Sequence, residues 1–121
     1  MVNILITGSR GIKNKIIIFH ILDKNVPDGS MVIQGGAEGV DSLTLDWCNK
    51  CKKDIHWKTM EPVKNNRDYF LHRNAEMVGM CDRVIAIWDG KSRGTKFTID
   101  YAKARNIPVI IFNQQGEIYA Q

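Results

Sequence analysis

The chain alternates between short apolar runs and longer segments in which apolar residues recur with helical spacing. A short apolar run bounded by turn residues is typical of a buried strand, whereas apolar residues at i, i+3, i+4 and i+7 indicate an amphipathic helix. The pattern predicts five strands, at Val2–Thr7, Ser30–Gln34, Asp54–Thr59, Arg83–Trp88 and Ile107–Phe112. It predicts four helices, at residues 12–24, 38–50, 65–80 and 95–105.

Strands that alternate with helices predict an α/β fold, a Rossmann-like, doubly wound parallel sheet with crossover helices. The run Arg83–Trp88 is almost entirely apolar, as expected of a strand that is covered on both faces. We expect the strand order 3-2-1-4-5, which places the topological switch point between the first and fourth strands. Residues 1–112 are interpreted as one domain, and residues 113–121 as a polar C-terminal tail.

Three glycine-bearing turns each follow a predicted strand and precede a predicted helix. Backbone N–H groups at such turns and at helix N-termini attract phosphate, and basic side chains in two of the turns add full charges. Because ligands of these sheets bind beyond the carboxyl ends of the strands, we expect the turns to form one pocket that holds a phosphate-bearing small molecule, interpreted as a nucleotide. The turns are Thr7-Gly8-Ser9-Arg10, Gln34-Gly35-Gly36-Ala37-Glu38-Gly39 and Asp89-Gly90-Lys91-Ser92-Arg93-Gly94-Thr95.

Several of these residues also have a purely structural interpretation. Gly8 and Gly36 can serve tight strand-to-helix turns without touching a ligand. Asp41 can favour the start of a helix or hold a ribose hydroxyl. The basic residues at 91–96 can form a solvated loop. Trp88 ends the fourth predicted strand, where its ring can stack on a base or pack in the core.

Composition and charge narrow the classes of function. Apolar residues make up 44% of the 121 residues and charged residues 25%, which is ordinary for a globular protein, and the net charge of +4 favours anionic partners. No apolar stretch approaches the roughly 20 residues of a membrane span, and residues 1–7 carry no basic leader. We therefore expect a cytoplasmic protein without a membrane partner.

The three cysteines suit a reducing compartment. Cys48 and Cys51 form a C-x-x-C motif late in a predicted helix, away from the helix N-terminus that would favour a thiolate. Cys81 and His56 share no recognisable zinc-ligand spacing with them. We expect no metal site and no cofactor.

Four segments in order resemble the SLOG superfamily: I-T-G-S-R, Q-G-G-A-E-G-V-D-S-L, R-N-A-E-M and W-D-G-K-S-R-G-T-K-F-T-I-D-Y-A. This Rossmann-like group includes the DNA-processing Smf/DprA proteins, the LOG cytokinin-activating phosphoribohydrolases, and small stand-alone phage and bacterial proteins. The chain is most similar to the small stand-alone branch, over about residues 3 to 112. The resemblance implies a nucleotide or nucleotide-derived ligand.

The resemblance also carries particular residues. Gly35, Gly36 and Gly39 fall on the glycine-rich turn of the family, and the 94–95 segment falls on its second phosphate-binding turn. A functional arginine of the LOG branch corresponds to Arg73. In the LOG motif P-G-G-x-G-T-x-x-E, the catalytic glutamate corresponds to Thr98 here, and residues 90–92 replace the P-G-G. Threonine does not ionise near neutral pH, so we expect a binder rather than an enzyme and assign no catalytic residue.

Three functions therefore follow from the sequence. The first is a sensor or sequestering protein for a nucleotide-type signal, such as ADP-ribose or a cyclic nucleotide. The second is a phosphoribohydrolase that cleaves an N-glycosidic bond, and the third is a single-stranded DNA binder, disfavoured because the basic residues cluster at turns. A homo-oligomer is expected from apolar residues on the helices. The predicted ligand-binding residues are Thr7, Gly8, Ser9, Arg10, Gly35, Gly36, Ala37, Gly39, Asp41, Arg73, Asn74, Trp88, Asp89, Lys91, Ser92, Arg93, Gly94 and Thr95.

Overall fold

A computed structural model describes residues 1–61 and 67–119 of the chain. Within these residues, five parallel strands form one sheet in the order β3-β2-β1-β4-β5, which confirms the predicted topology. Four helices connect the strands. The elements are β1 (Asn3–Gly8), α1 (Lys15–Asn25), β2 (Met31–Gln34), α2 (Val40–Lys50), β3 (His56–Thr59), α3 (Arg67–Met80), β4 (Arg83–Ile87), α4 (Arg93–Ala104) and β5 (Val109–Phe112).

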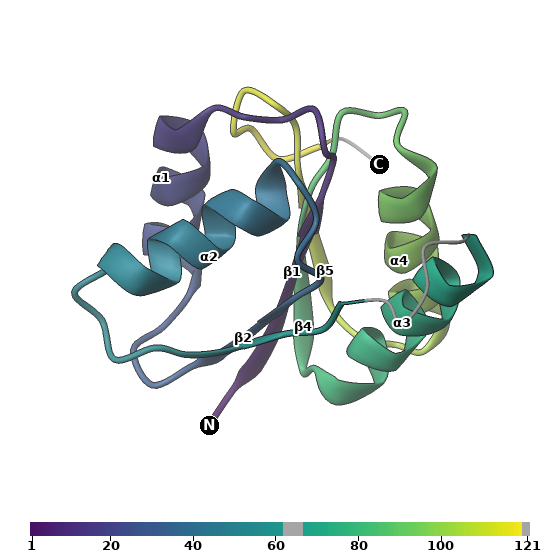
Figure 1. Cartoon of the computed structure of the whole chain (residues 1–121), viewed down its shortest axis with the longest axis horizontal. Helices are drawn as coiled ribbons and strands as arrows, with labels where there is room; N and C mark the ends of the chain where they lie inside the picture. The colour runs from purple at the N-terminus through teal and green to yellow at the C-terminus, as the bar shows by residue number, and fades with distance from the viewer. Residues whose placement is uncertain (62–66, 120–121) are drawn as a thin grey trace.

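The helices form two layers, with α1 and α2 on one face of the sheet and α3 and α4 on the other (Figure 1). Successive side chains of a strand point to opposite faces, so one apolar strand supplies both cores. In β1, Ile4 and Ile6 pack in the core beside α1 and α2, whereas Leu5 packs with Met77 and Val78 of α3. This arrangement explains why the central strands have no polar face.

All five strands end at the same edge of the sheet, because they are parallel (Figure 1). The central pair β1 and β4 run in register, with Leu5 beside Val84 and Gly8 beside Ile87. The chain leaves β1 toward α1 on one face and leaves β4 toward α4 on the opposite face. At this switch point the two loops diverge to opposite faces of the sheet, and such folds bind ligands between them.

Several boundaries differ from the prediction for local reasons. The first helix begins at Lys15 rather than residue 12, because the Asn14 side chain caps it by accepting the Ile17 N–H at 3.2 Å. The fourth helix begins at Arg93, two residues early, so part of the third predicted turn is helical. The strands β3 and β5 are two residues shorter than predicted at their starts. The predicted start of the third helix, residues 65–66, lies outside the described residues.

The segment after β5 returns to the sheet. Phe112 and Ile118 form an antiparallel bridge, and the Tyr119 N–H donates to the Ile111 carbonyl at 2.7 Å. This return brings Tyr119 back to the edge where β4 ends. Among the described residues, none of the helices has the length and apolar character needed to span a bilayer.

Candidate functional site

A cleft of about 790 Å³ lies at the carboxyl edge of the sheet, at the switch point between β1 and β4. Its volume is within the range of small-molecule sites, about 300–1,000 Å³. It draws its lining from all three glycine-bearing segments and from α3. The predicted site residues that line it are Thr7, Gly8, Arg10, Ala37, Asp41, Arg73, Asn74, Asp89, Ser92, Arg93, Gly94 and Thr95.

The remaining predicted residues lie around this cleft. Gly35 and Gly36 line a hollow of about 420 Å³ that shares Arg10, Ala37 and Phe70 with the cleft. Trp88 lines a third cavity of about 480 Å³ on the other side of the β4 end. The last three, Ser9, Gly39 and Lys91, line none of these three cavities.

The buried side chain of Gln34 organises the second glycine turn. Its Oε1 accepts the Gly36 N–H at 2.6 Å, and its Nε2 donates to the Thr59 hydroxyl. Gly36 has a φ of +75°, a conformation that residues with a Cβ rarely adopt. A polar residue at the end of a buried strand therefore replaces the hydrogen bonds that the turn cannot make to itself.

Arg73 enters from α3 and holds the same turn from the other side. Its Nη1 donates to the carbonyls of Gly35 (2.6 Å) and Met60 (2.9 Å), and its Nε donates to the Asn74 side chain at 3.0 Å. The guanidinium packs so closely on Gly35 that a Cβ there would lie 2.7 Å from the Arg73 Cζ. Arg73 is only 9% exposed, and the three protein acceptors satisfy most of the N–H donors of this buried cation.

Asp41 lies in the first turn of α2 at the floor of the cleft and is 7% exposed. Its carboxylate accepts the Ala37 N–H at 3.2 Å. Burial raises the pKa of Asp41 to about 6, although the Ala37 and Gly35 N–H groups and the positive charges of Arg73 and Arg10 lower it. The cleft thus contains a carboxyl group that changes charge close to physiological pH.

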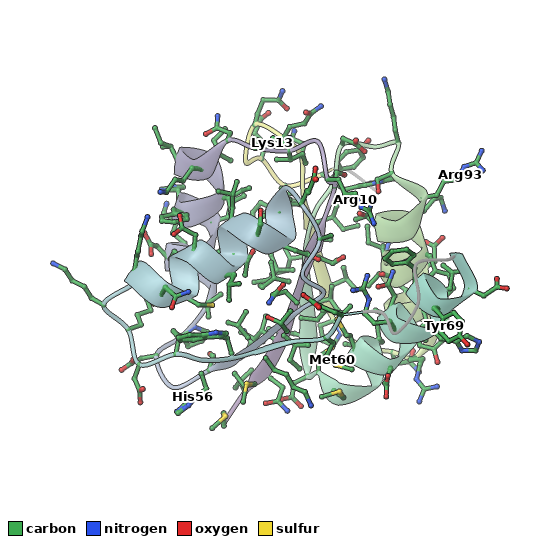
Figure 2. The ribbon with its side chains drawn as sticks, viewed as in Figure 1. Arg10, Lys13, His56, Met60, Tyr69 and Arg93 are labelled. Atoms are coloured by element: carbon green, nitrogen blue, oxygen red, sulfur yellow. The ribbon has the colours of Figure 1, made fainter. Side chains whose placement is uncertain are left out.

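The ring of Phe70, which lines the cleft, lies beside two cations. The guanidinium carbon of Arg10 is 5.3 Å from the ring centroid, and that of Arg73 is 5.4 Å away. These cation–π contacts keep both arginines beside the cleft. Figure 2 shows Arg10 at the sheet edge between the helical layers, whereas Arg93 extends outward from the start of α4.

The third turn is tied to the first. Ser9 is 1% exposed, and its hydroxyl accepts the Asp89 N–H at 3.0 Å. The Asp89 Oδ1 accepts the N–H groups of Lys91 and Ser92, both at 2.8 Å, which sets the entry to α4. Burial alone would raise the pKa of Asp89, but these bonds from Ser92 and Lys91 lower it, so the carboxylate stays charged. Ser9 therefore joins two turns rather than facing the ligand space.

The N-terminus of α4 faces the cleft through Gly94 and Thr95. The first helical bond of α4 runs from the Lys96 N–H to the Ser92 carbonyl, so the preceding N–H groups have no acceptor inside the helix. Among the described residues, a Cβ on Gly94 would meet no atom within 4 Å beyond its chain neighbours and the backbone of its own helix. The described residues therefore leave room for a side chain at this position, in contrast to Gly35.

Thr98, at the position of the catalytic glutamate of the resembled LOG branch, is fully buried. Its hydroxyl donates to the Gly94 carbonyl at 3.1 Å within α4, and it does not line the cleft.

Elsewhere, burial raises the pKa of the Cys48 thiol to about 12, with the neighbouring Cys51 adding to the effect. The described residues contain no group of three or more His, Cys, Asp or Glu side chains placed to bind a metal.

Several cleft residues were not among the predicted site residues. Phe70 lies one turn before Arg73 and Asn74 on the same face of α3, and Met77 lies one turn after them; both line the cleft with them. Their helical spacing was visible in the sequence but indicated only an inward face. Gln34 gave no signal, because its role depends on contact with β3.

No protein-family model matches the chain, and no curated protein matches it at a significant level. Among solved structures, it is similar to the X-ray structure of TM1055, a target of the Northeast Structural Genomics Consortium. The TM-score is 0.70 and the sequence identity 23%, over 91% of this chain and 73% of that chain. This likeness shows the class of fold, an α/β Rossmann-like sheet.

Proposed function

We propose that the protein binds a phosphate-bearing, nucleotide-type small molecule in the cleft and does not cleave it. The main support is that the α4 N-terminus lines the same cleft as the side chains of Arg10 and Arg73. The unpaired N–H groups of a helix N-terminus and a guanidinium are both strong partners for phosphate oxygens. The resemblance to the small stand-alone SLOG proteins implies the same class of ligand.

The arginines contribute unequally. Arg10 is held beside the cleft by Phe70 and is otherwise exposed, so its guanidinium is available to a phosphate. Arg93 lines the cleft but extends outward, and it would have to turn toward a ligand. Arg73 gives most of its donors to protein acceptors, so we assign it mainly to holding the glycine turn.

Calorimetry with ribose 5-phosphate, nucleoside monophosphates and ADP-ribose tests the proposal. Losing a hydrogen bond to a charged group costs about 1.5–3 kcal/mol, so Arg10→Ala should weaken binding about 10- to 100-fold, and Arg93→Ala less. Arg105→Ala is the matched control, because Arg105 caps the opposite end of α4. If Arg10→Ala, Arg73→Ala and Arg93→Ala all bind as tightly as the parent, the assignment is wrong.

One observation favours the alternative, a phosphoribohydrolase. Thr98 cannot supply the missing acid, but Asp41 is a carboxyl group in the cleft with a pKa of about 6, near the value that suits a general acid or base. Incubating the protein with nucleoside monophosphates and analysing for free base and ribose phosphate decides between the two. Release of base that stops in Asp41→Asn would favour the enzyme, whereas intact ligand recovered from a tight complex would favour the binder.

A further inference from the structure

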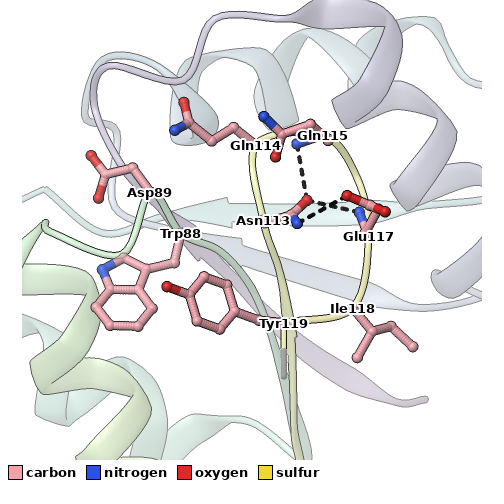
Figure 3. A pocket seen from close by; sticks show the side chains of 8 residues that line it. All are labelled: Trp88, Asp89, Asn113, Gln114, Gln115, Glu117, Ile118 and Tyr119. Atoms are coloured by element: carbon pink, nitrogen blue, oxygen red, sulfur yellow. Dashed lines mark hydrogen bonds between the residues drawn. The ribbon is translucent and has the colours of Figure 1, made fainter. Parts of the chain in front are cut away.

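The cavity of about 480 Å³ beyond the β4 end differs in chemistry from the cleft (Figure 3). The end of β4 supplies Trp88 and Asp89, and the returning segment after β5 supplies Gln114, Glu117 and Tyr119 with its neighbours. Two carboxylates, three carboxamides and two aromatic rings line the space, and none of the lysines and arginines whose side chains are described does. The cleft, in contrast, has Arg10, Arg73 and Arg93 in its lining.

The walls of this cavity are held in place by specific contacts. Asn113 Oδ1 accepts the N–H groups of Gln115 (3.0 Å) and Glu117 (2.9 Å), which fixes the returning turn. The Trp88 indole N–H donates to the Ser92 carbonyl at 3.0 Å. The Trp88 and Tyr119 rings pack with centroids 5.3 Å apart. The aromatic wall is therefore pre-organised, which lowers the entropic cost of binding.

The lining indicates a planar group that carries N–H donors. Aromatic rings provide a stacking surface for a base, and carboxylate and amide oxygens accept hydrogen bonds. Glu117 is exposed at the cavity wall; its Oε1 accepts a hydrogen bond from the Asn113 Nδ2 at 3.3 Å, and the described residues supply no partner for its Oε2. A carboxylate with a free oxygen at a cavity wall is well suited to adjacent ring and amino N–H groups, such as those of guanine.

The two spaces are neighbours, because Asp89 lines both. We propose that the carboxylate-lined cavity is the base subsite of the ligand whose phosphate lies in the cleft, and that it selects a base with adjacent N–H donors, as in guanine. This inference rests on the proposed function. The ligand would then be a base-bearing nucleotide that lies along the sheet edge from the α4 N-terminus toward β5.

Calorimetric titration of the full chain with GMP, AMP and ribose 5-phosphate tests the inference. GMP should bind at least about tenfold more tightly than ribose 5-phosphate, because a hydrogen bond to a charged group changes the affinity by about that factor. GMP should also bind more tightly than AMP. Glu117→Gln should remove most of the GMP advantage, because the NH₂ group of glutamine is a donor and cannot accept a hydrogen bond from the N–H groups of guanine. The same variant should bind ribose 5-phosphate as the parent does. Glu76→Gln makes the same chemical change at an exposed position of α3 outside the three cavities, and it should change neither.

The outcomes separate the two proposals. If ribose 5-phosphate binds but GMP binds no more tightly, or if AMP is preferred, the base subsite is overturned while the phosphate site stands. A GMP advantage that survives Glu117→Gln overturns it equally. If none of the three compounds binds, the proposed function itself fails. A GMP advantage lost in Glu117→Gln and kept in Glu76→Gln supports the inference.

Discussion

The carboxyl group of Asp41 is the ionisable group in the cleft whose charge depends most on the fold. Its pKa of about 6 lies above the ordinary value of 3.8 because the group is buried. Between these two pH values, the folded protein keeps a proton that the unfolded chain has released. Stability must therefore fall as the pH rises through this window, and at neutral pH the buried charge costs on the order of 3 kcal/mol.

Asp41→Asn should remove this pH dependence. Asparagine keeps an oxygen to accept the Ala37 N–H but carries no charge. The stability of the variant relative to the parent should rise between pH 4 and pH 6.5, as measured by urea unfolding at several pH values.

Asp46→Asn is the control for that measurement, because the contribution of Asp46 to stability depends on pH in the opposite direction. Asp46 pairs with Lys15 and Lys50, each at 3.0 Å, and hydrogen bonds from these two lysines lower its pKa. Its contribution to stability is present at neutral pH and is lost as the pH falls through its lowered pKa. A pH-independent stability difference for Asp41→Asn would contradict the burial of its charge.

Gly35 and Arg73 should be energetically coupled. A methyl group at position 35 would displace the Arg73 guanidinium and break its bonds to the Gly35 and Met60 carbonyls. We expect Gly35→Ala to destabilise the protein by about 2 kcal/mol, and by much less in an Arg73→Ala background. Urea unfolding of the parent, both single variants and the double variant measures the coupling; strictly additive effects would show that the guanidinium does not require glycine.

At the scale of elements, the apolar pattern predicted every strand and helix but not each boundary. Ile4–Ile6 and residues 84–87 are buried on both sides, so their pattern is unambiguous. The boundaries missed depend on side chains that bond to the backbone, such as the Asn14 cap and the Asp89 bonds before α4. Such bonds form with residues only a few positions away, but many asparagines and aspartates could form them, and the sequence does not say which do.

The N-terminus of α4 yields a prediction that separates folding from binding. Gly94 and Gly79 are both exposed helical glycines, and a Cβ on either would meet no described atom within 4 Å outside its chain neighbours and its own helix backbone. Replacing either with alanine should stabilise the fold by up to about 1 kcal/mol through helix propensity. Only Gly94 lines the cleft, so Gly94→Ala should also weaken ligand binding, by about tenfold, because the methyl group occupies ligand space.

Thermal unfolding and calorimetry on the same two variants check this prediction. Gly79→Ala should unfold at a higher temperature and bind the nucleotide as the parent does. Gly94→Ala should unfold at a higher temperature and bind it more weakly. Equal binding by both variants would mean that the phosphate does not approach the start of α4.

At the scale of the whole molecule, the turns could be placed together from the sequence because parallel strands end at one edge. What the sequence did not reveal is how the turns are fixed. Gln34, Ser9 and Arg73 each reach an element distant in the chain, and Asp41 has its raised pKa only because the fold buries it. The position of a site thus follows from topology, whereas its electrostatics follow from packing between distant residues.

The exposed edge of the sheet makes the predicted homo-oligomer testable. Among the described residues, β3 pairs on one side only, with β2, and all four of its residues are exposed. Trp57 in this strand is 42% exposed. An unpaired edge strand is a template for pairing with another chain, and a half-exposed tryptophan adds apolar area to such a contact. We therefore expect two copies to associate through β3.

Light scattering during size-exclusion chromatography measures this association. The parent should show about twice the 13.8 kDa of one chain at high concentration and dissociate on dilution. Trp57→Lys should be monomeric, because a charge on an edge strand opposes pairing. Ile16→Lys is the control, since Ile16 is 82% exposed on α1, away from β3. A parent that stays monomeric at every concentration, or a dimer that survives Trp57→Lys, would place the interface elsewhere or remove it.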